Sequence, residues 1–496
     1  MPSSVDPQTC AKNAREAVRT RWRAIADEVR GSAKSVLATD VDEVWNEQIE
    51  ETLEFYAVWT PLADGYKAAR QAVEQALSGR KNLRDFQPWH HERVGAPKSS
   101  LDGARVSVLS DNRDNAQFRR LRISSGEQLD AIGLVKRAGF EPEQFVPLVN
   151  IAAGEWLARA TRYAPEELDA LRGECEQREI PAIRRPDLPV VTPFHYDASV
   201  LYPSRWAALF KELSRAETNA EAARQWGEKH VRPLLKRMRE AGQGEPPVYV
   251  ACLAADGDRM GAAIDCLVSA EANREFSREL AKFPLDARGI VEQEHLGSLI
   301  YAGGDDVLAF LPVAKAPHCA AALAKVFRDR LQGKVTLSVG IGVAHVIEPM
   351  SVLLQLARGA ERAAKEADRD ALAIIVDKRS GGQRRLAMQW RSDPVGRLSK
   401  DARLLDEKLS TGKVYELEAL LRRFPNADQA KARPAAAQAL AAYANDILSH
   451  ASEGKGALLT DLGVEVAQDY AQLRGALAVA IDRILVVRSL REWGFA

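Results

Sequence analysis

Between residues 248 and 377 the apolar positions fall into short runs that alternate with helical patterns and turn residues. VYVACLAA has the length and composition of a buried strand, and SLIYA and VLAFLP flank GGDD like the two strands of a hairpin. The pattern predicts strands at 248–255, in a hairpin at 298–312, at 335–346 and at 371–377, with helices at 259–283, 317–332 and 351–368.

Two acidic clusters lie at the ends of these predicted strands. Asp256 directly follows the first strand, with Asp258 two residues later, and Asp305 and Asp306 lie in the hairpin turn. The element order β-α-β-β-α-β-α-β is that of a ferredoxin-like sheet with additions, in which the first strand and the hairpin are neighbours. We therefore expect Asp256, Asp305 and Asp306 to converge.

Converging carboxylates at this position are typical of phosphoryl-transfer sites. Such sites hold two hard cations about 3.5–4 Å apart with oxygen ligands, activating an attacking hydroxyl and neutralising the leaving pyrophosphate. We take Asp256, Asp305 and Asp306 as candidate catalytic residues and ligands of Mg²⁺ or Mn²⁺. The alternative is that each cluster is an ordinary turn, since a Gly-Asp turn often closes a hairpin without any catalytic role.

Three glycines accompany the candidate acids. Gly303 and Gly304 would let the hairpin turn tightly and leave room for a base or a phosphate, and the carbonyl of Gly257 could serve as a further metal ligand. Lys365, late in the helix before the last strand, could reach a triphosphate, although a lysine at such a place is more often simply solvated. These four residues are the candidate nucleotide-binding residues.

Helical patterns rich in Ala, Leu and charged residues flank this region. VLATDVDEVW (36–45) and FYAVWTPL (55–62) suit either strand or buried helix, and AGQGEPP (241–247) is the clearest linker. The predicted fold class is α+β, a ferredoxin-like palm of the GGDD cyclase or polymerase type flanked by helical domains. Its predicted parts are a helical region with a candidate first-palm remnant (1–98), a mainly helical middle domain (99–240), the catalytic palm (245–383) and a C-terminal helical domain without strands (384–496).

Composition narrows the function classes. Lys plus Arg and Asp plus Glu both number 69, so the chain as a whole lacks the basic character of a nucleic-acid-binding protein. The five cysteines form no CxxC pair, which argues against a zinc ribbon or a disulfide framework. With no apolar leader or long apolar segment, we expect a cytoplasmic protein without a membrane partner.

A basic run follows the last predicted strand. Lys378, Arg379, Arg384, Arg385 and Arg391 are interrupted by no acidic residue and enclose the flexible segment SGG (380–382). The run suits either a solvated charged face or a contact with phosphate or RNA, and the sequence leaves both open.

These segments together resemble a known family. VYVACLAADGDRMG, LIYAGGDDVLAFLP, LSVGIGVAH and ALAIIVDKRSGG, supported upstream by GAPKSSLDGAR (95–105), GEQLDAIGLVKRAG (126–139) and PFHYDASVL (193–201), are similar to the Cmr-type large subunit of type III-B CRISPR effector complexes. The resemblance implies partners (other Cmr-type subunits, a crRNA and target RNA) and a palm that converts ATP to cyclic oligoadenylate when target RNA binds. It also implies that Asp256, Asp305 and Asp306 are the metal-binding acids.

The resemblance is incomplete. The HD nuclease domain, the opening of a first palm and a four-cysteine zinc site, all usual in the family, are not recognised in this sequence. We therefore do not extend the resemblance to DNA cleavage. A free-standing GGDEF-like nucleotidyl cyclase or palm polymerase, and a scaffold that binds nucleotide without turnover, are the alternative functions.

Overall fold

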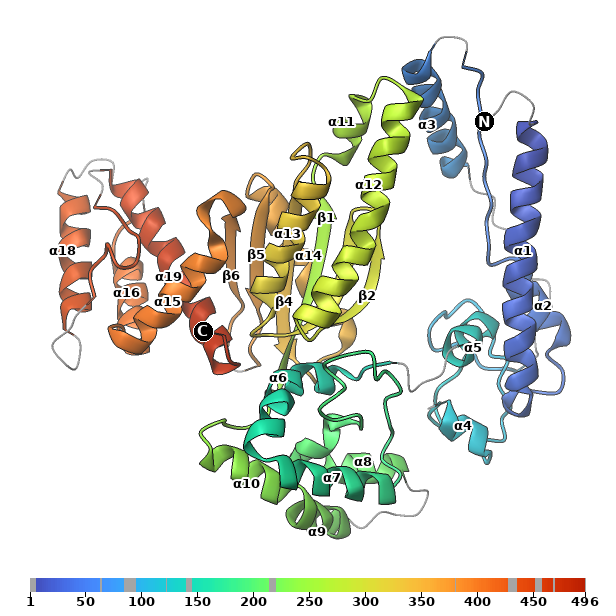
Figure 1. Cartoon of the computed structure of the whole chain (residues 1–496), viewed down its shortest axis with the longest axis horizontal. Helices are drawn as coiled ribbons and strands as arrows, with labels where there is room; N and C mark the ends of the chain where they lie inside the picture. The colour runs from blue at the N-terminus through green and yellow to red at the C-terminus, as the bar shows by residue number, and fades with distance from the viewer. Residues whose placement is uncertain are drawn as a thin grey trace. The chain divides into compact units, whose positions relative to one another are not determined.

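The chain divides into two compact units in the computed structural model (Figure 1). The first consists of Met1–Phe145 with Leu267–Ala270, and the second of Val146–Cys266 with Glu271–Ala496. The structure describes residues 6–62, 65–83, 95–121, 123–139, 145–213, 220–379, 381–426, 435–450, 457–466 and 469–495. Each unit is described below by itself.

The first unit is helical in its described residues. Its helices are α1 (Pro7–Ser32), α2 (Asp42–Glu50), α3 (Tyr66–Asn82), α4 (Ala116–Arg120) and α5 (Ala131–Ala138). Trp45 of α2 is at the centre of its core. The segment 36–45 thus runs into a helix, while residues 53–62 are neither helix nor strand. Extended pairing here is limited to isolated bridges such as Leu37 with Leu109, so the described residues show no sheet of a first palm.

A layer of helices precedes the sheet in the second unit. It contains α6 (Leu148–Tyr163), α7 (Pro165–Gln177), α8 (Trp206–Leu213), α9 (Ala220–His230) and α10 (Arg232–Glu240). Their shared core includes Trp156, Phe194 and Trp226. Trp156 also donates a hydrogen bond of 3.1 Å to the carbonyl of Gly244 and so fixes the linker that leads into the sheet.

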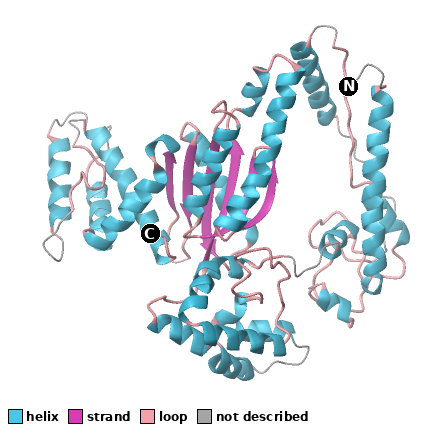
Figure 2. Ribbon diagram, viewed as in Figure 1, coloured by secondary structure: helices cyan, strands magenta, loops and turns pink. Residues whose placement is uncertain are grey.

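Six strands form one mixed sheet in the order β2-β3-β1-β4-β5-β6 (Figure 2). They are β1 (Tyr249–Gly257), β2 (Ser298–Gly303), β3 (Asp306–Pro312), β4 (Leu337–His345), β5 (Ala371–Val376) and β6 (Arg384–Gln389). β1 pairs antiparallel with both β3 and β4, which is the ferredoxin-like core, and β5 adds in parallel to β4. The predicted α+β class with a ferredoxin-like palm and helical flanks is confirmed.

Helices cover both faces of the sheet. Between β1 and β2 come α11 (Met260–Asp265), α12 (Ala270–Arg288) and the short π-helix η5 (Gly289–Glu294), and α13 (Ala316–Arg330) follows β3. Phe283 of α12 and Phe327 of α13 meet edge to face, 4.9 Å between ring centroids. The opposite face carries α14 (Met350–Glu366) and α6, which share a core with Val250, Cys252 and Ala254 of β1. Alternate residues of β1 thus point to opposite helical layers.

One prediction about the C-terminal region is wrong. Residues 384–389 form strand β6, whereas we expected no strand after the last palm strand. β6 pairs antiparallel with β5, from Val376 with Arg384 to Ala371 with Gln389. Only Leu386 of this strand is buried, so an edge strand with two arginines gave no apolar run to detect.

The chain ends in a helical bundle of α15 (Pro394–Glu407), α16 (Thr411–Arg423), α18 (Ala436–Ser449) and α19 (Tyr470–Glu492). Their apolar core includes Leu417, Leu440, Leu477 and Ile484. Beyond α19, Trp493 stacks on Tyr249 of β1 at 4.3 Å between centroids. The described part of the chain contains no helix that is both long enough and apolar enough to cross a membrane.

Candidate active site

The predicted acids come together at one end of the sheet. Asp256 is the next-to-last residue of β1, and its backbone pairs with Ser338 at the start of β4. In the β2–β3 hairpin, Gly303 pairs with Asp306, leaving a two-residue turn of Gly304 and Asp305. Because β3 lies beside β1, this turn stands next to Asp256.

The three carboxylates are close enough to perturb one another. The pKa of Asp306 is raised to about 6, first by burial and then by a hydrogen bond with Asp256 and by the charges of Asp256 and Asp305. The pKa of Asp305 is also raised, first by burial and then by the charge of Asp256. This cluster of negative charge would be relieved by a proton or a cation.

Lys365 of α14 provides a positive charge in this cluster. Its Nζ lies 2.5 Å from Oδ2 of Asp256 and 2.9 Å from Oε1 of Glu361, one helical turn earlier. Burial acts to lower the pKa of Lys365, but its hydrogen bonds to these two carboxylates outweigh that effect and raise it. Lys365 is thus held as a charged ammonium against the candidate metal ligand. The sequence analysis missed Glu361, although the i,i+4 spacing of Glu361 and Lys365 was a signal for such a pair.

The three glycines at the acidic end of the sheet are each explained by a different structural feature. Gly304 has a φ of +65°, which the hairpin turn requires. A Cβ at Gly303 would lie 2.3 Å from the hydroxyl oxygen of Tyr301, so the expected free space is filled by that ring. A Cβ at Gly257 would lie 2.7 Å from Oδ2 of Asp305, so glycine there permits the close approach of the hairpin turn to β1.

Asp258 has a different role from Asp256, despite its place in the same DGD motif. It is 3% exposed and accepts hydrogen bonds from Thr336 Oγ1 at 2.8 Å, Ser338 Oγ at 2.7 Å and the backbone N–H of Asp370 at 3.0 Å. Three donors occupy its two oxygens, so it joins the ends of β1, β4 and the α14–β5 turn. Asp258 is a structural residue that positions the acidic end.

No ready-made cage for a metal ion is present among the residues that the structure describes. No three of their His, Cys, Asp and Glu side chains are arranged to hold one ion together. Two of the candidate acids, Asp256 and Asp306, do form a hydrogen-bonded pair. Two carboxylates match what Mg²⁺ normally takes from a protein, since this ion completes its shell with water and substrate phosphates.

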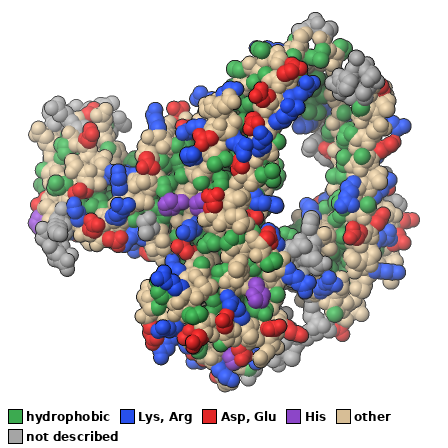
Figure 3. Space-filling model, in the orientation of Figure 1, with side chains coloured by type: hydrophobic (Ala, Val, Ile, Leu, Met, Phe, Trp, Pro, Cys, Tyr) green, Lys and Arg blue, Asp and Glu red, His purple; other side chains and the backbone are tan. Residues whose placement is uncertain are grey.

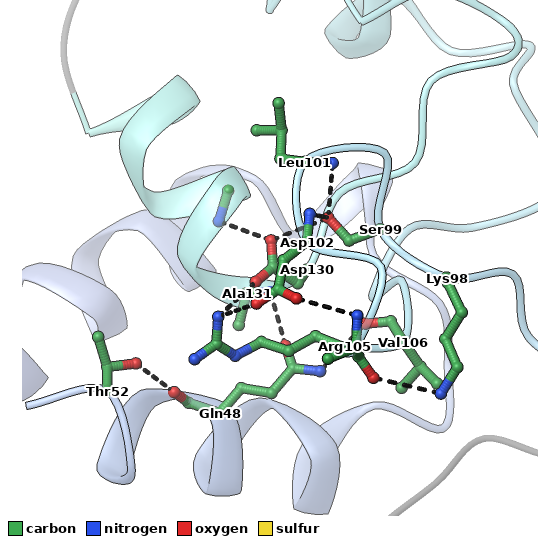
Figure 4. Close-up of polar contacts among 12 residues, drawn as sticks. Gln48, Thr52, Lys98, Ser99, Leu101, Asp102, Arg105, Val106, Asp130 and Ala131 are labelled. Carbon is green, nitrogen blue, oxygen red and sulfur yellow. Dashed lines mark hydrogen bonds and ion pairs between the residues drawn. The ribbon is translucent and has the colours of Figure 1, made fainter.

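A second polar cluster, in the first unit, accounts for GAPKSSLDGAR (Figure 4). Asp130 caps α5 by accepting from the N–H of Gly133 at 3.0 Å, and it also accepts from Ser99 Oγ at 3.2 Å. Gln48 of α2 accepts from the N–H of Ala131 and donates to the carbonyl of Val106. These contacts join the loop to α2 and α5, which supports a structural role for Ser99.

Family comparison identifies the sheet that carries the acids. A model described as "Cas10/Cmr2, second palm domain" matches residues 249–373, from the start of β1 into β5. Residues 249–373 form a Cas10/Cmr2 second palm domain. Its fold is nucleotidyltransferase-like, and all of the candidate acids together with Lys365 lie within it.

The similarity to known sequences and structures extends beyond the palm. The CRISPR system Cmr subunit Cmr2 of Pyrococcus furiosus is 31% identical over 256 residues, which cover 44% of this chain and 28% of that protein. The type III-B Cmr-beta cryo-EM structure in the apo state matches with a TM-score of 0.57 at 13% identity, over 98% of this chain and 69% of that one. The Cmr-beta structure bound to cognate target RNA matches with a TM-score of 0.54 at 14% identity, over 86% and 62%. At these identities the structural matches show a shared fold, and the sequence match spans under a third of the curated relative.

Proposed function

We propose that this chain is the large subunit of a crRNA-guided type III-B effector complex, and that its palm converts ATP to cyclic oligoadenylate when target RNA binds. The observation that carries the proposal is the meeting of Asp256 with Asp305 and Asp306 at one end of a Cas10/Cmr2 second palm domain. Attack of a ribose 3′-hydroxyl on a nucleoside triphosphate needs such clustered carboxylates to hold the metal ions.

The acids would hold Mg²⁺ or Mn²⁺ together with the phosphates of ATP. Bound there, a divalent ion supplies charge that lowers the pKa of the attacking ribose hydroxyl and stabilises the pyrophosphate leaving group. Asp256 and Asp306 are in hydrogen-bonding contact and are the primary ligands in this proposal. Asp305, held against Gly257, is the third acid and strengthens the negative field.

Lys365 has two successive partners in this proposal. Without nucleotide, its ammonium neutralises Asp256 and Glu361. Its raised pKa keeps it charged at neutral pH, so it is available to pair with a phosphate oxygen of ATP. Lys365 would thereby position the triphosphate against the acids.

The proposed partners are other Cmr-type subunits, a crRNA and the target RNA. The sequence resemblance and the shared fold with Cmr-beta, one of whose structures is bound to cognate target RNA, support this assembly. Basic and acidic side chains are interspersed on the face of the molecule shown in Figure 3, consistent with a net charge of zero. Recognition of RNA would then come from guide pairing and partner subunits more than from this chain's overall charge.

Replacing both hairpin acids tests the site. The double variant Asp305→Ala/Asp306→Ala should abolish the formation of cyclic oligoadenylate by the assembled complex, measured from radiolabelled ATP, without preventing assembly. The turn is at the surface, so losing two repelling charges opens no core. Asp329→Ala, which removes an exposed acid of α13 that pairs with Lys325 at 3.1 Å, is the matched control and should retain full activity. Product formation by the double variant at the wild-type rate would refute the assignment.

A further inference from the structure

A pocket of about 280 Å³ lies between the β5–β6 connection and helices α16 and α19. It is at the end of the sheet opposite the acids. β5 runs parallel to β4, with Leu372 beside Val339 near the acidic end and Val376, which lines the pocket, beside Val343 at the other end. The pocket therefore belongs to neither the ATP site nor the acidic cluster.

Three cations converge on this pocket. Lys378 and Arg384 come from the palm and Arg488 from α19, and the described residues that line the pocket include no Asp or Glu. The balancing carboxylates stand outside the lining: Glu492 is 2.6 Å from Lys378, and Glu418 is 2.8 Å from Arg384. The wall of the pocket is thus positive although its surroundings are neutral.

The remaining lining suits the close approach of an oxyanion. The hydroxyl of Tyr415 accepts a hydrogen bond of 2.8 Å from Arg488, so its own proton can be donated into the pocket. A Cβ at Gly381 or Gly382 would meet no atom of the described residues within 4 Å. Packing among those residues therefore does not call for glycine, whereas a ligand that approaches the backbone closely would.

We propose that this pocket binds a phosphate group, presented by a nucleotide or by an RNA strand. An ammonium that gives one N–H to Glu492 has two more to donate, and Arg488 and the Tyr415 hydroxyl add charge-assisted and neutral donors. Within the basic run that follows the palm, this proposal assigns Lys378 and Arg384 to contact with phosphate. Arg379 points elsewhere, forming an ion pair of 3.2 Å with Glu348.

The competing explanation is that the same ion pairs only fasten α19 to the palm. Glu492 distinguishes the two explanations, because it pairs with Lys378 and Arg488 but does not line the pocket. If the ion pairs only attach α19 to the palm, Glu492→Gln and Lys378→Gln change phosphate binding in the same direction. If the cations serve a phosphate, Glu492→Gln frees Lys378 and Arg488 and strengthens phosphate binding, whereas Lys378→Gln weakens it.

The test is the affinity for inorganic phosphate, obtained from the rise of the thermal unfolding midpoint at constant ionic strength with chloride as the reference anion. Lys378→Gln and Arg488→Gln should each weaken binding by roughly tenfold or more. Arg379→Gln, the neighbouring cation outside the lining, is the control and should bind like the wild type. Glu492→Gln should bind more tightly.

Two further probes identify the source of the phosphate. Adenosine monophosphate and a short oligouridylate are titrated in the same way. Tighter binding of adenosine monophosphate indicates a nucleotide, and tighter binding of the oligouridylate indicates an RNA strand. Equal phosphate affinity in the wild type, Lys378→Gln and Arg488→Gln would overturn the proposal. So would weakening by Glu492→Gln, since that result makes the ion pairs fasteners only. These measurements do not involve ATP turnover and can fail independently of the proposed enzyme activity.

Discussion

At the residue scale, aspartates of similar sequence context differ in their surroundings. Asp258 accepts three hydrogen bonds in the interior, whereas Asp306 is exposed on one side and faces two other carboxylates. The first arrangement stabilises the folded chain. The second stores electrostatic repulsion at the site where we propose that a cation binds.

The raised pKa of Asp306 makes a pH-dependent prediction. Its folded-state pKa of about 6 exceeds the ordinary value, so the stability associated with its proton is present at low pH and is lost as pH rises through 6. Asp306→Asn should therefore unfold at a higher temperature than the wild type at pH 8 without divalent ions. The difference should shrink as pH falls below 6. Thermal unfolding followed by circular dichroism across pH 5–8 measures this.

An exposed-acid variant provides the comparison. Asp329→Asn removes a carboxylate of an ordinary surface ion pair and should show no change in stability centred near pH 6. A stability difference between Asp306→Asn and the wild type that stays constant from pH 5 to 8 would contradict the assigned repulsion.

Sequence alone indicated which acids converge but not how they interact. The strand ends and the hairpin placed Asp256, Asp305 and Asp306 at one end of the sheet because the ferredoxin-like order fixes which strands are neighbours. The inward turn of Asp258 depends on Thr336 and Ser338, which are remote from it in sequence. The pairing of Lys365 with Asp256 likewise depends on how closely α14 packs on the sheet.

At the element scale, two glycines of β4 set that packing. A Cβ at Gly340 would lie 2.0 Å from the backbone nitrogen of Glu361, and one at Gly342 would lie 2.4 Å from that of Ala357. Backbone atoms cannot move aside as a side chain can. Glycine at these positions therefore lets α14 lie close against β4 and brings Lys365 to the acids.

Gly340→Ala should accordingly displace α14 and cost about 1–3 kcal/mol of unfolding free energy, the usual penalty for overpacking. Gly359→Ala is a matched control on α14, because its Cβ would meet Ile375 Cδ1 at an ordinary 3.6 Å. That change should be neutral or stabilise by up to about 1 kcal/mol through helix propensity. Chemical denaturation of both variants checks the pair. Equal free energies for the two would contradict the close-packing argument.

The elements that sequence predicted best were those with continuous apolar burial. β1, β4 and β5 are buried along nearly their whole length and appeared as apolar runs. β6 lies at the sheet edge with mostly exposed residues, so its arginines suggested a charged loop. The segment 36–45 was ambiguous because Trp45 is buried on one face of a helix of which the segment contains only the start. That stretch is too short to show the helical repeat of apolar residues.

At the scale of the whole second unit, a buried ion pair anchors the C-terminal bundle. Asp401 of α15, 1% exposed, contacts Arg483 of α19, which also donates to the carbonyl of Leu462 at 2.7 Å. Arg397 adds a third charge, 3.3 Å from Asp401. The buried cation Arg483 and the part-buried Arg397 thus share one buried carboxylate.

Asp401→Ala should destabilise the chain by about 3–5 kcal/mol, since it leaves the buried Arg483 without a carboxylate partner. Glu416→Ala, which breaks the surface pair with Lys413 at 3.0 Å, should cost at most about 1 kcal/mol. Urea denaturation followed by tryptophan fluorescence distinguishes the two. A loss for Asp401→Ala no larger than that for Glu416→Ala would show that the buried pair does not anchor the bundle.

The central claim is that the palm makes cyclic oligoadenylate under the control of target RNA. The most direct measurement is ATP turnover by the isolated chain, compared with the assembled complex with and without complementary RNA. We expect little turnover by the chain alone or by the complex without target, and strong turnover on adding complementary RNA, because a ligand shifts activity only by binding the active state better. Strong turnover by the chain alone, unaffected by RNA, would contradict this account and favour a free-standing cyclase.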